Sequence, residues 1–301
     1  MGLDVNAVQF LIAAHKRGVG LGEVVMLGRQ DLNVFPAKMR RLLQEAELPS
    51  NLFEPGAPDT RFAEPVFKAL GAREIYSIDF SAYEGASFVH DLNNPIGPEL
   101  RERFDTVYDG GTLEHVFHFP TALKNMMEML RPGGHLFIHT VANSYCGHGF
   151  YQFSPELFFR ALSSENGYEL ERMVAHRMGP YGNWHEVNDP EKIGARVELI
   201  SYSPIQLLVQ ARRAKIVPVF ERTPQQSDFV PRWDNKASGS QPPIAASAAA
   251  PPRKYGAPRP RLAKSLPRLA RLLNAFTIGV GLLKTHSLWN RKSFRRVGKK
   301  D

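Results

Sequence analysis

Acidic and histidine side chains gather in the short stretch 109–115, which reads DGGTLEH. It directly follows the apolar run Phe104–Tyr108, a pattern that predicts a buried strand. Polar groups just after a strand of an open α/β sheet lie at the edge where such sheets bind ligands. Glu114 and His115 are therefore candidates for a site that binds a ligand or moves a proton. The alternative is that they are solvated residues of a loop or of a helix start.

A second histidine lies in the segment 143–155, NSYCGHGFYQFSP, which is dense in glycine, aromatic and polar residues. Loops of this composition at a sheet edge carry function more often than packing. Histidine is the side chain whose pKa lies nearest working pH, so the candidates for a general base are His148, then His115, then His139. Tyr151 is placed to orient a substrate, and we expect Phe150 to pack.

Two further acids end predicted strands. Asp79 follows the run 74–78, EIYSI, and Asp91 follows the run 87–90, SFVH. A carboxylate accepts hydrogen bonds from two hydroxyl groups at once, which suits a sugar diol. The alternatives are an ordinary acid at a strand end for Asp79 and a turn former for Asp91, ahead of Asn93-Asn94-Pro95.

The elements that would position these residues alternate along the chain. Apolar periodicity predicts a strand at 23–27, helices at 36–47 and 62–70, and a helix at 119–130. Arg131-Pro132-Gly133-Gly134 predicts a type II turn, and a strand follows at 135–141. A strand, helix and strand in this order form a βαβ unit with parallel strands. A helix from Ser154 and two strands, 168–176 and 206–212, complete the expected sheet.

The whole block 104–140 resembles the class I S-adenosylmethionine-dependent methyltransferases, in which a fourth strand, an "LEH" loop and an "RPGG" turn before the fifth strand have this form. The resemblance covers about residues 23–212. It implies an α/β fold with a doubly wound, mostly parallel seven-stranded sheet and an antiparallel C-terminal strand.

The resemblance also implies a cofactor, S-adenosyl-L-methionine, and residues that hold it. Asp79 would bind the ribose diol, and Asp91 with the Leu92 backbone amide would lie near the adenine amine. Glu114 and His115 would line the methionine and acceptor side. Methyl transfer to a hydroxyl needs a base, so His148, His115 and Tyr151 are the catalytic candidates.

The first-strand motif departs from the pattern of the family. The family has acid-x-Gly-x-Gly-x-Gly, whereas this chain reads MLGRQD at 26–31 and keeps one glycine of the three, Gly28. Gly28 and Asp79 are 51 positions apart, which indicates an insertion at about 29–60. Arg29 is either a bidentate partner of the methionine carboxylate or a surface arginine.

This departure motivates an alternative function, a non-catalytic scaffold or partner protein in a biosynthetic assembly. A dinucleotide oxidoreductase is disfavoured because no GxGxxG follows the first strand.

Composition divides the chain into a methyltransferase-like domain at 1–220, a flexible Pro/Ala/Ser-rich linker at 221–261 and a basic amphipathic tail at 262–301. Residues 251–301 hold 14 Lys or Arg and one acid, although the net charge of the whole chain is only +8. The body is therefore mildly acidic, which argues against specific nucleic-acid binding. The tail is interpreted as a peripheral contact with an anionic membrane or as a solvated extension.

The remaining expectations concern compartment, metal and substrate. The single cysteine, Cys146, excludes an internal disulfide and is typical of a cytoplasmic protein, here with contact at the inner membrane surface. The sequence has no CxxC or four-thiolate pattern, so we expect no metal. The acceptor is expected to be a small molecule of sugar or glycolipid type.

Overall fold

The computed structural model describes residues 2–55, 61–179, 182–229 and 284–299. The chain divides into two compact units. The larger comprises Met1–Val187, Ser203–Pro224 and Arg296–Asp301, and the smaller comprises Asn188–Tyr202 and Gln225–Arg295. All the predicted site residues belong to the larger unit.

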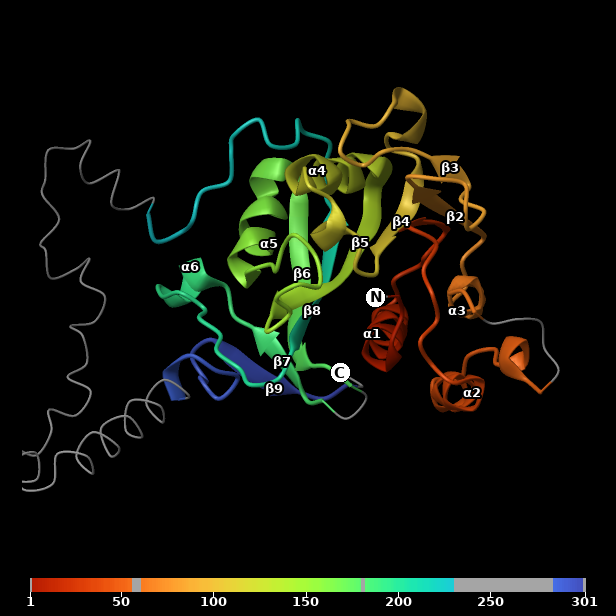
Figure 1. Ribbon diagram of the computed structural model, residues 1–301, viewed down its shortest axis with the longest axis horizontal. Helices are drawn as coiled ribbons and strands as arrows, with labels where there is room; N and C mark the ends of the chain where they lie inside the picture. The colour runs from red at the N-terminus through yellow and green to blue at the C-terminus, as the bar shows by residue number, and fades with distance from the viewer. Residues whose placement is uncertain (1, 56–60, 180–181, 230–283, 300–301) are drawn as a thin grey trace, which may run out of the picture. The chain divides into compact units, whose positions relative to one another are not determined.

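The larger unit is built on one mixed β-sheet (Figure 1). Its strand order is β3-β2-β1-β4-β5-β8-β6-β7. The first five strands pair in parallel, and the β5–β8, β8–β6 and β6–β7 pairs are antiparallel. The strands are β1 (Glu23–Leu27), β2 (Glu74–Asp79), β3 (Phe88–Val89), β4 (Phe104–Asp109), β5 (Leu130–Asn143), β6 (Tyr168–Arg177), β7 (Trp184–Val187) and β8 (Ile205–Arg213). A further strand, β9 (Phe294–Val297), spans the boundary between the units.

This topology confirms the predicted doubly wound sheet. The strands from β3 to β6 form the expected seven-stranded core, with β8 antiparallel to both of its neighbours. Strand β7 extends that core by one more antiparallel strand.

Helices cover both faces of the sheet, with α4 and α5 on one face and α1 on the other (Figure 1). Helix α1 is not among the predicted elements. It starts at Asp4, whose side chain accepts a hydrogen bond from the backbone N–H of Ala7, and it buries an apolar face that includes Phe10 and Leu11. The helices are α1 (Val5–Lys16), α2 (Pro36–Glu45), α3 (Glu64–Ala69), α4 (Phe119–Met129), α5 (Pro155–Ala161) and, in the smaller unit, α6 (Pro190–Ile193), with short 3-10 helices η1 (Asn51–Phe53), η2 (Pro98–Leu100), η3 (Leu113–His115) and η4 (Ser164–Asn166).

The Pro-Gly-Gly segment differs from the predicted free-standing turn. Helix α4 ends at Met129, and β5 already begins at Leu130. The β4–β5 register steps from Phe104↔Leu130 to Thr106↔His135, so residues 131–134 bulge out of the ladder. Gly133 has a φ of 85°, which glycine adopts without strain. Residues 131–134 therefore follow the end of the helix, as predicted, but they belong to a bulge in β5.

The segments beyond the sheet lie partly outside the described residues. The predicted linker 221–261 and the amphipathic part of the tail, 262–283, fall mostly there, and these boundaries stay predictions. From the end of the chain, Arg296 and Lys299 join the larger unit, where the Lys299 ammonium donates to Asn6 Oδ1 at 2.8 Å. Within the described part of the chain, no helix is long and apolar enough to cross a membrane.

Candidate functional site

Gly28, Asp79 and Thr112 lie close together at the carboxyl ends of β1, β2 and β4. Gly28 ends β1 with a φ of 67°, and its backbone N–H donates to the Ile78 carbonyl of β2 at 2.8 Å. A methyl group at Gly28 would lie 3.4 Å from Thr112 Oγ1 and 3.7 Å from Asp79 Oδ2. Glycine is favoured here because the backbone is left-handed and polar groups approach it from both neighbouring strands. Polar side chains from different segments therefore meet at the predicted edge of the sheet.

Asp79 stands at the end of β2 with its carboxylate half-buried. Its Oδ1 accepts a hydrogen bond from the backbone N–H of Phe80 at 2.6 Å. The other oxygen, Oδ2, lies 3.7 Å from where a methyl group at Gly28 would stand. Binding of a ribose by Asp79 stays a prediction.

Gln30 occupies the position of the second glycine of the family motif, and its contacts were not predicted from the sequence. Its side chain is buried, and its amide donates to the Leu27 carbonyl and, at 3.4 Å, to Thr112 Oγ1. A side chain at Gly110 would collide with the Gln30 amide. The Gln30 side chain therefore fills the altered turn after β1, and it fits there because Gly110, after β4, has no side chain.

Arg29 is held by protein groups. Its Nε donates to Glu64 Oε1 at 2.7 Å, and Nη1 donates to the Glu84 carbonyl at 2.9 Å. The guanidinium carbon also lies 4.0 Å from the centre of the Phe62 ring. Arg29 thus ties α3 and the loop after β2 to the first turn, and its contact with a methionine carboxylate stays a prediction.

Asp91 organises its own turn. Its Oδ1 accepts from the backbone and side-chain N–H groups of Asn93, and its Oδ2 accepts from the Asn94 amide at 3.1 Å. These hydrogen bonds from Asn93 lower the pKa of Asp91. Leu92 is buried behind this turn. The turn-forming interpretation of Asp91 is therefore observed, and the adenine contact of Asp91 and Leu92 stays a prediction.

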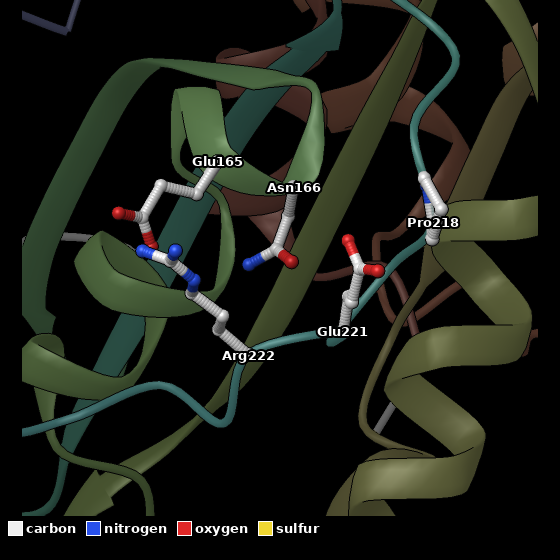
Figure 2. A pocket seen from close by; sticks show the side chains of 5 residues that line it. All are labelled: Glu165, Asn166, Pro218, Glu221 and Arg222. Atoms are coloured by element: carbon white, nitrogen blue, oxygen red, sulfur yellow. The ribbon is translucent and has the colours of Figure 1, made fainter.

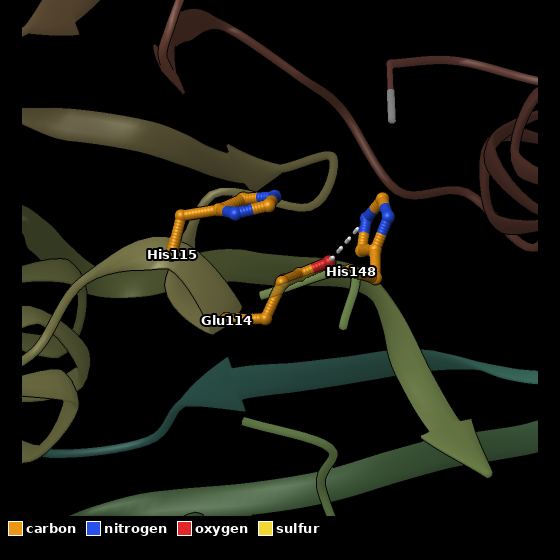
Figure 3. Close-up of side chains that lie close together, drawn as sticks. All are labelled: Glu114, His115 and His148. Atoms are coloured by element: carbon orange, nitrogen blue, oxygen red, sulfur yellow. Dashed lines mark ion pairs between the residues drawn. The ribbon is translucent and has the colours of Figure 1, made fainter. Parts of the chain in front are cut away.

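Glu114, His115 and His148 lie together beside the end of β4 (Figure 3). Glu114 and His115 come from η3, and His148 comes from the loop after β5. The Nε2 atom of His148 lies 3.9 Å from Glu114 Oε1, and the two imidazole rings are 5.1 Å apart between centroids. Two of the candidate bases and the predicted acid therefore form one cluster, although 33 positions separate His115 from His148.

The loop after β5 reaches the cluster because of Gly149. Its neighbours Phe150 and Tyr151 both donate backbone hydrogen bonds to the Glu114 carbonyl, at 2.8 and 3.2 Å. A methyl group at Gly149 would lie 2.7 Å from that same carbonyl oxygen, closer than packed atoms allow. The composition of this loop predicted a functional role, but Gly149 was not predicted as the residue that permits the approach.

The carboxylate of Glu114 is fully buried, at 0% exposure. Thr140 Oγ1 donates to its Oε2 at 2.9 Å, and Oε1 has no hydrogen-bond partner among the described residues. Burial raises the pKa of Glu114. Burial, followed by the charge of Glu114, also raises the pKa of Asp109 to about 7. Partial burial lowers the pKa of both His115 and His148.

The Tyr151 side chain contacts the segment that leads into α4. Its hydroxyl donates to the Phe117 carbonyl at 2.7 Å, and its ring packs on Phe119 with centroids 4.8 Å apart. Tyr151 thus fixes the β5 loop to the start of α4. Its role in orienting an acceptor stays a prediction.

Phe150 is exposed, contrary to the expectation that it packs. It is 67% exposed and lies beside Phe117, which is 61% exposed, with ring centroids 5.8 Å apart. Both rings adjoin the histidine cluster in sequence, because Phe117 follows His115 and Phe150 follows His148 by two residues each. The loop hydrogen bonds to Glu114 place the Phe150 backbone at the cluster and leave its ring in solvent.

His139, the third candidate base, lies in a different environment. It is buried in β5, one residue before Thr140, whose side chain contacts Glu114. Because successive side chains of a strand point to opposite faces, His139 faces away from the cluster. Its ring lies 5.6 Å from that of the buried His176. His139 belongs to the core beneath α1.

These buried histidines predict a pH-dependent stability. Burial, followed by the charge of His139, lowers the pKa of His176 to about 4 from an ordinary 6.5. Between pH 6.5 and 4 the unfolded chain therefore binds a proton at this site that the folded chain does not. We expect the free energy of unfolding of the wild type to fall, relative to His176→Asn, by up to about 1.4 kcal/mol for each pH unit below 6.5.

Urea unfolding of both proteins from pH 4.5 to 7.5 checks this difference. Comparing the two proteins removes the opposite contribution of Asp109, whose raised pKa makes the folded state bind the extra proton. A constant difference across the range would contradict the assignment.

A separate hollow in the larger unit is lined by charged and amide side chains, with one proline, and contains none of the predicted residues (Figure 2). Its lining residues are Glu165, Asn166, Pro218, Glu221 and Arg222. It has no cluster of catalytic type, so the carboxyl edge of the sheet remains the candidate site.

Comparison with known proteins gives one family and several solved structures. A family model described as a methyltransferase domain matches residues 28–193, more than half of the chain. No curated protein matches the chain. The segment matched by the model contains both the turn at Gly28 and the histidine cluster.

Similar solved structures include three bacterial proteins. The 1,6-didemethyltoxoflavin-N1-methyltransferase of Burkholderia thailandensis, solved with 1,6-didemethyltoxoflavin and S-adenosylhomocysteine, is 14% identical with a TM-score of 0.39, over 70% of this chain and 79% of that chain. The N-methyltransferase NodS of Bradyrhizobium japonicum, solved with S-adenosyl-l-homocysteine, is 15% identical with a TM-score of 0.37, over 69% and 85%. A protein of Bacillus halodurans described as a putative methyltransferase is 12% identical with a TM-score of 0.36, over 68% and 99%.

Proposed function

The chain belongs to the methyltransferase domain family, and on that premise we propose that it methylates a hydroxyl oxygen of a small, sugar-containing acceptor. The enzyme uses S-adenosyl-L-methionine as its methyl donor. The observation that carries the choice of a hydroxyl is the cluster of two imidazoles with a buried carboxylate at the carboxyl edge of the sheet. An oxygen acceptor must lose a proton during the transfer, and these ring nitrogens supply a place for it.

Several residues at the edge support the binding of the cofactor there. Gly28 leaves the space that a side chain would fill between Thr112 and Asp79, so a ligand backbone or sugar can approach β1 closely. Asp79 would hold the ribose hydroxyls through Oδ2, with Asp91 and Leu92 towards the adenine. When bound, the cofactor supplies an electrophilic methyl group on a sulfonium.

The transfer itself is an in-line displacement in which position matters most. With the cofactor bound, the acceptor oxygen would take over the methyl group, and the electron pair of the broken S–C bond would stay on sulfur. The hydroxyl proton passes to a ring nitrogen at the cluster, for which His148 is our first choice and His115 our second. Glu114 beside them would stabilise the positive charge that the imidazole gains.

The acceptor class is suggested by the two exposed rings next to the cluster. Phe117 and Phe150 offer two exposed aromatic rings in edge-to-face contact, and a sugar offers both an apolar C–H face for such a ring and hydroxyls for the imidazoles. The basic segment 262–301 supports a membrane-bound version of this acceptor, a glycolipid, since clustered Lys and Arg attract anionic lipid.

An acceptor panel with methyl-labelled S-adenosyl-L-methionine tests the proposal. The panel holds a nucleotide sugar, a free monosaccharide, a glycolipid in anionic or neutral vesicles, and an amine such as a polyamine. We expect labelled methyl ethers from the sugars, identified by mass and NMR, and a preference for anionic vesicles with the glycolipid. Labelled N-methyl products alone would contradict a hydroxyl acceptor.

A further inference from the structure

The three side chains of the cluster have the atom types and spacing of a metal site. Each of Glu114, His115 and His148 offers one ligand atom, and these atoms all lie within 4.8 Å of one another. We propose that Glu114, His115 and His148 bind a divalent transition-metal ion. Binding of the ion is independent of the proposed function, whereas its part in the reaction rests on that function.

The buried carboxylate is the first argument for a cation. Glu114 is fully buried, and its Oε1, the oxygen nearest His148, has no hydrogen-bond partner among the described residues. No Lys or Arg pairs with it in the part of the chain that the structure describes. A buried carboxylate oxygen without a donor is costly. A cation held between this oxygen and the two imidazoles removes that cost.

The geometry is the second argument. Ligand atoms about 2.0–2.2 Å from one Zn²⁺ ion lie roughly 3–4 Å apart. The separation of 3.9 Å between His148 Nε2 and Glu114 Oε1 meets this range directly. The wider spacing within the group would close by small rotations of the two histidines, which lie at the surface and contact each other. The Glu114 main chain is already fixed to the His148 loop by the two backbone hydrogen bonds beside Gly149.

The ligand types select the ion. Two imidazoles and one carboxylate suit Zn²⁺, Mn²⁺, Fe²⁺ or Co²⁺, whereas Mg²⁺ and Ca²⁺ prefer oxygen ligands alone. Three protein ligands leave coordination positions open, so a hydroxyl group of the acceptor can join them. The ion then takes over the task given above to the imidazole, since it lowers the pKa of a bound hydroxyl and lets the proton pass to water.

The sequence predicted no metal because the three ligands do not form a local motif. Glu114 and His115 are adjacent, but His148 is brought to them only by the β4–β5 pairing and the close approach at Gly149. A site of this kind becomes visible only in the folded chain.

Cobalt titration of the full-length protein tests the proposal. The protein is stripped with EDTA, and Co²⁺ is added while the visible absorption of the ion is recorded, followed by competition with Zn²⁺ and Mg²⁺. We expect one Co²⁺ per chain, displaced by Zn²⁺ and not by Mg²⁺. His148→Ala and Glu114→Gln should each weaken binding by at least about 10-fold.

Two control variants test whether the binding is specific to the three residues. His118→Ala and Cys146→Ser change exposed potential ligands outside the group and should bind as the wild type does. If Glu114→Gln fails to fold, the exposed His148 still provides the test. Absence of Co²⁺ binding, or equal binding by His148→Ala, overturns the proposal.

Calorimetry with S-adenosyl-L-methionine on the same stripped protein separates the two proposals. Cofactor binding and methyl transfer that persist without any metal would overturn the part of the ion in the reaction and leave the proposed function intact. Tight metal binding by a protein that does not bind the cofactor would do the opposite.

Discussion

The His148→Ala variant is expected to turn over at least about 100-fold more slowly than the wild type and to bind S-adenosyl-L-methionine with unchanged affinity. His148 reaches the cluster from the loop after β5, whereas the groups assigned to the ribose and adenine of the cofactor lie at or after the ends of β2 and β3. Removing the imidazole therefore affects the acceptor, whether the ring takes the proton or holds an ion. Single-turnover rates and calorimetric cofactor affinity, measured on the same preparation, check both parts.

The matched control is His118→Ala, which removes an exposed imidazole three residues after His115 and should retain turnover. The corresponding His115→Ala variant decides between the two candidate bases. A loss of turnover confined to His115→Ala would transfer the role to that residue. A parallel loss of turnover and cofactor affinity in His148→Ala would instead make His148 a structural or cofactor-side residue.

The sheet was predictable because its signals are local. Short apolar runs such as Phe104–Tyr108, each followed by a polar turn, define strands without knowledge of their neighbours. Parallel strands joined by helices then bring their carboxyl ends to one edge. Gly28, Asp79 and Glu114 were predicted at that edge from this pattern together with the resemblance to the family, and they lie there in the structure.

The features that sequence reasoning missed depend on contacts between distant segments. Helix α1 lacks strong amphipathic alternation, since it is buried on most of its surface. Gln30 looked like a defect in a glycine motif, and its meaning comes from Gly110, 80 positions later, which gives its amide room. The protein contacts of Arg29 could not be predicted either, because they come from Glu64 and Glu84 on other segments. In each case the deciding partner lies on another element.

Asp79→Ala should weaken binding of S-adenosyl-L-methionine by roughly 10- to 100-fold, because a hydrogen bond to a charged group contributes about 1.5–3 kcal/mol. The carboxylate is only half-buried and pairs with no described Lys or Arg, so its removal leaves no unpaired charge behind. Asp79→Asn keeps one acceptor oxygen and should fall between the wild type and Asp79→Ala. Calorimetric titration with S-adenosyl-L-methionine and S-adenosylhomocysteine measures all three.

The control for this variant lies on the same strand. Glu74→Ala removes an exposed acid from the opposite end of β2, so it changes the net charge equally but should leave cofactor affinity unchanged. Equal affinity in Asp79→Ala and the wild type would remove Asp79 from the ribose site and turn attention to Asp91. Absence of cofactor binding in the wild type at millimolar ligand would have a wider consequence. The Gln30-packed turn would then close the cofactor edge, and the chain would act as the non-catalytic partner that its altered glycine motif also suggests.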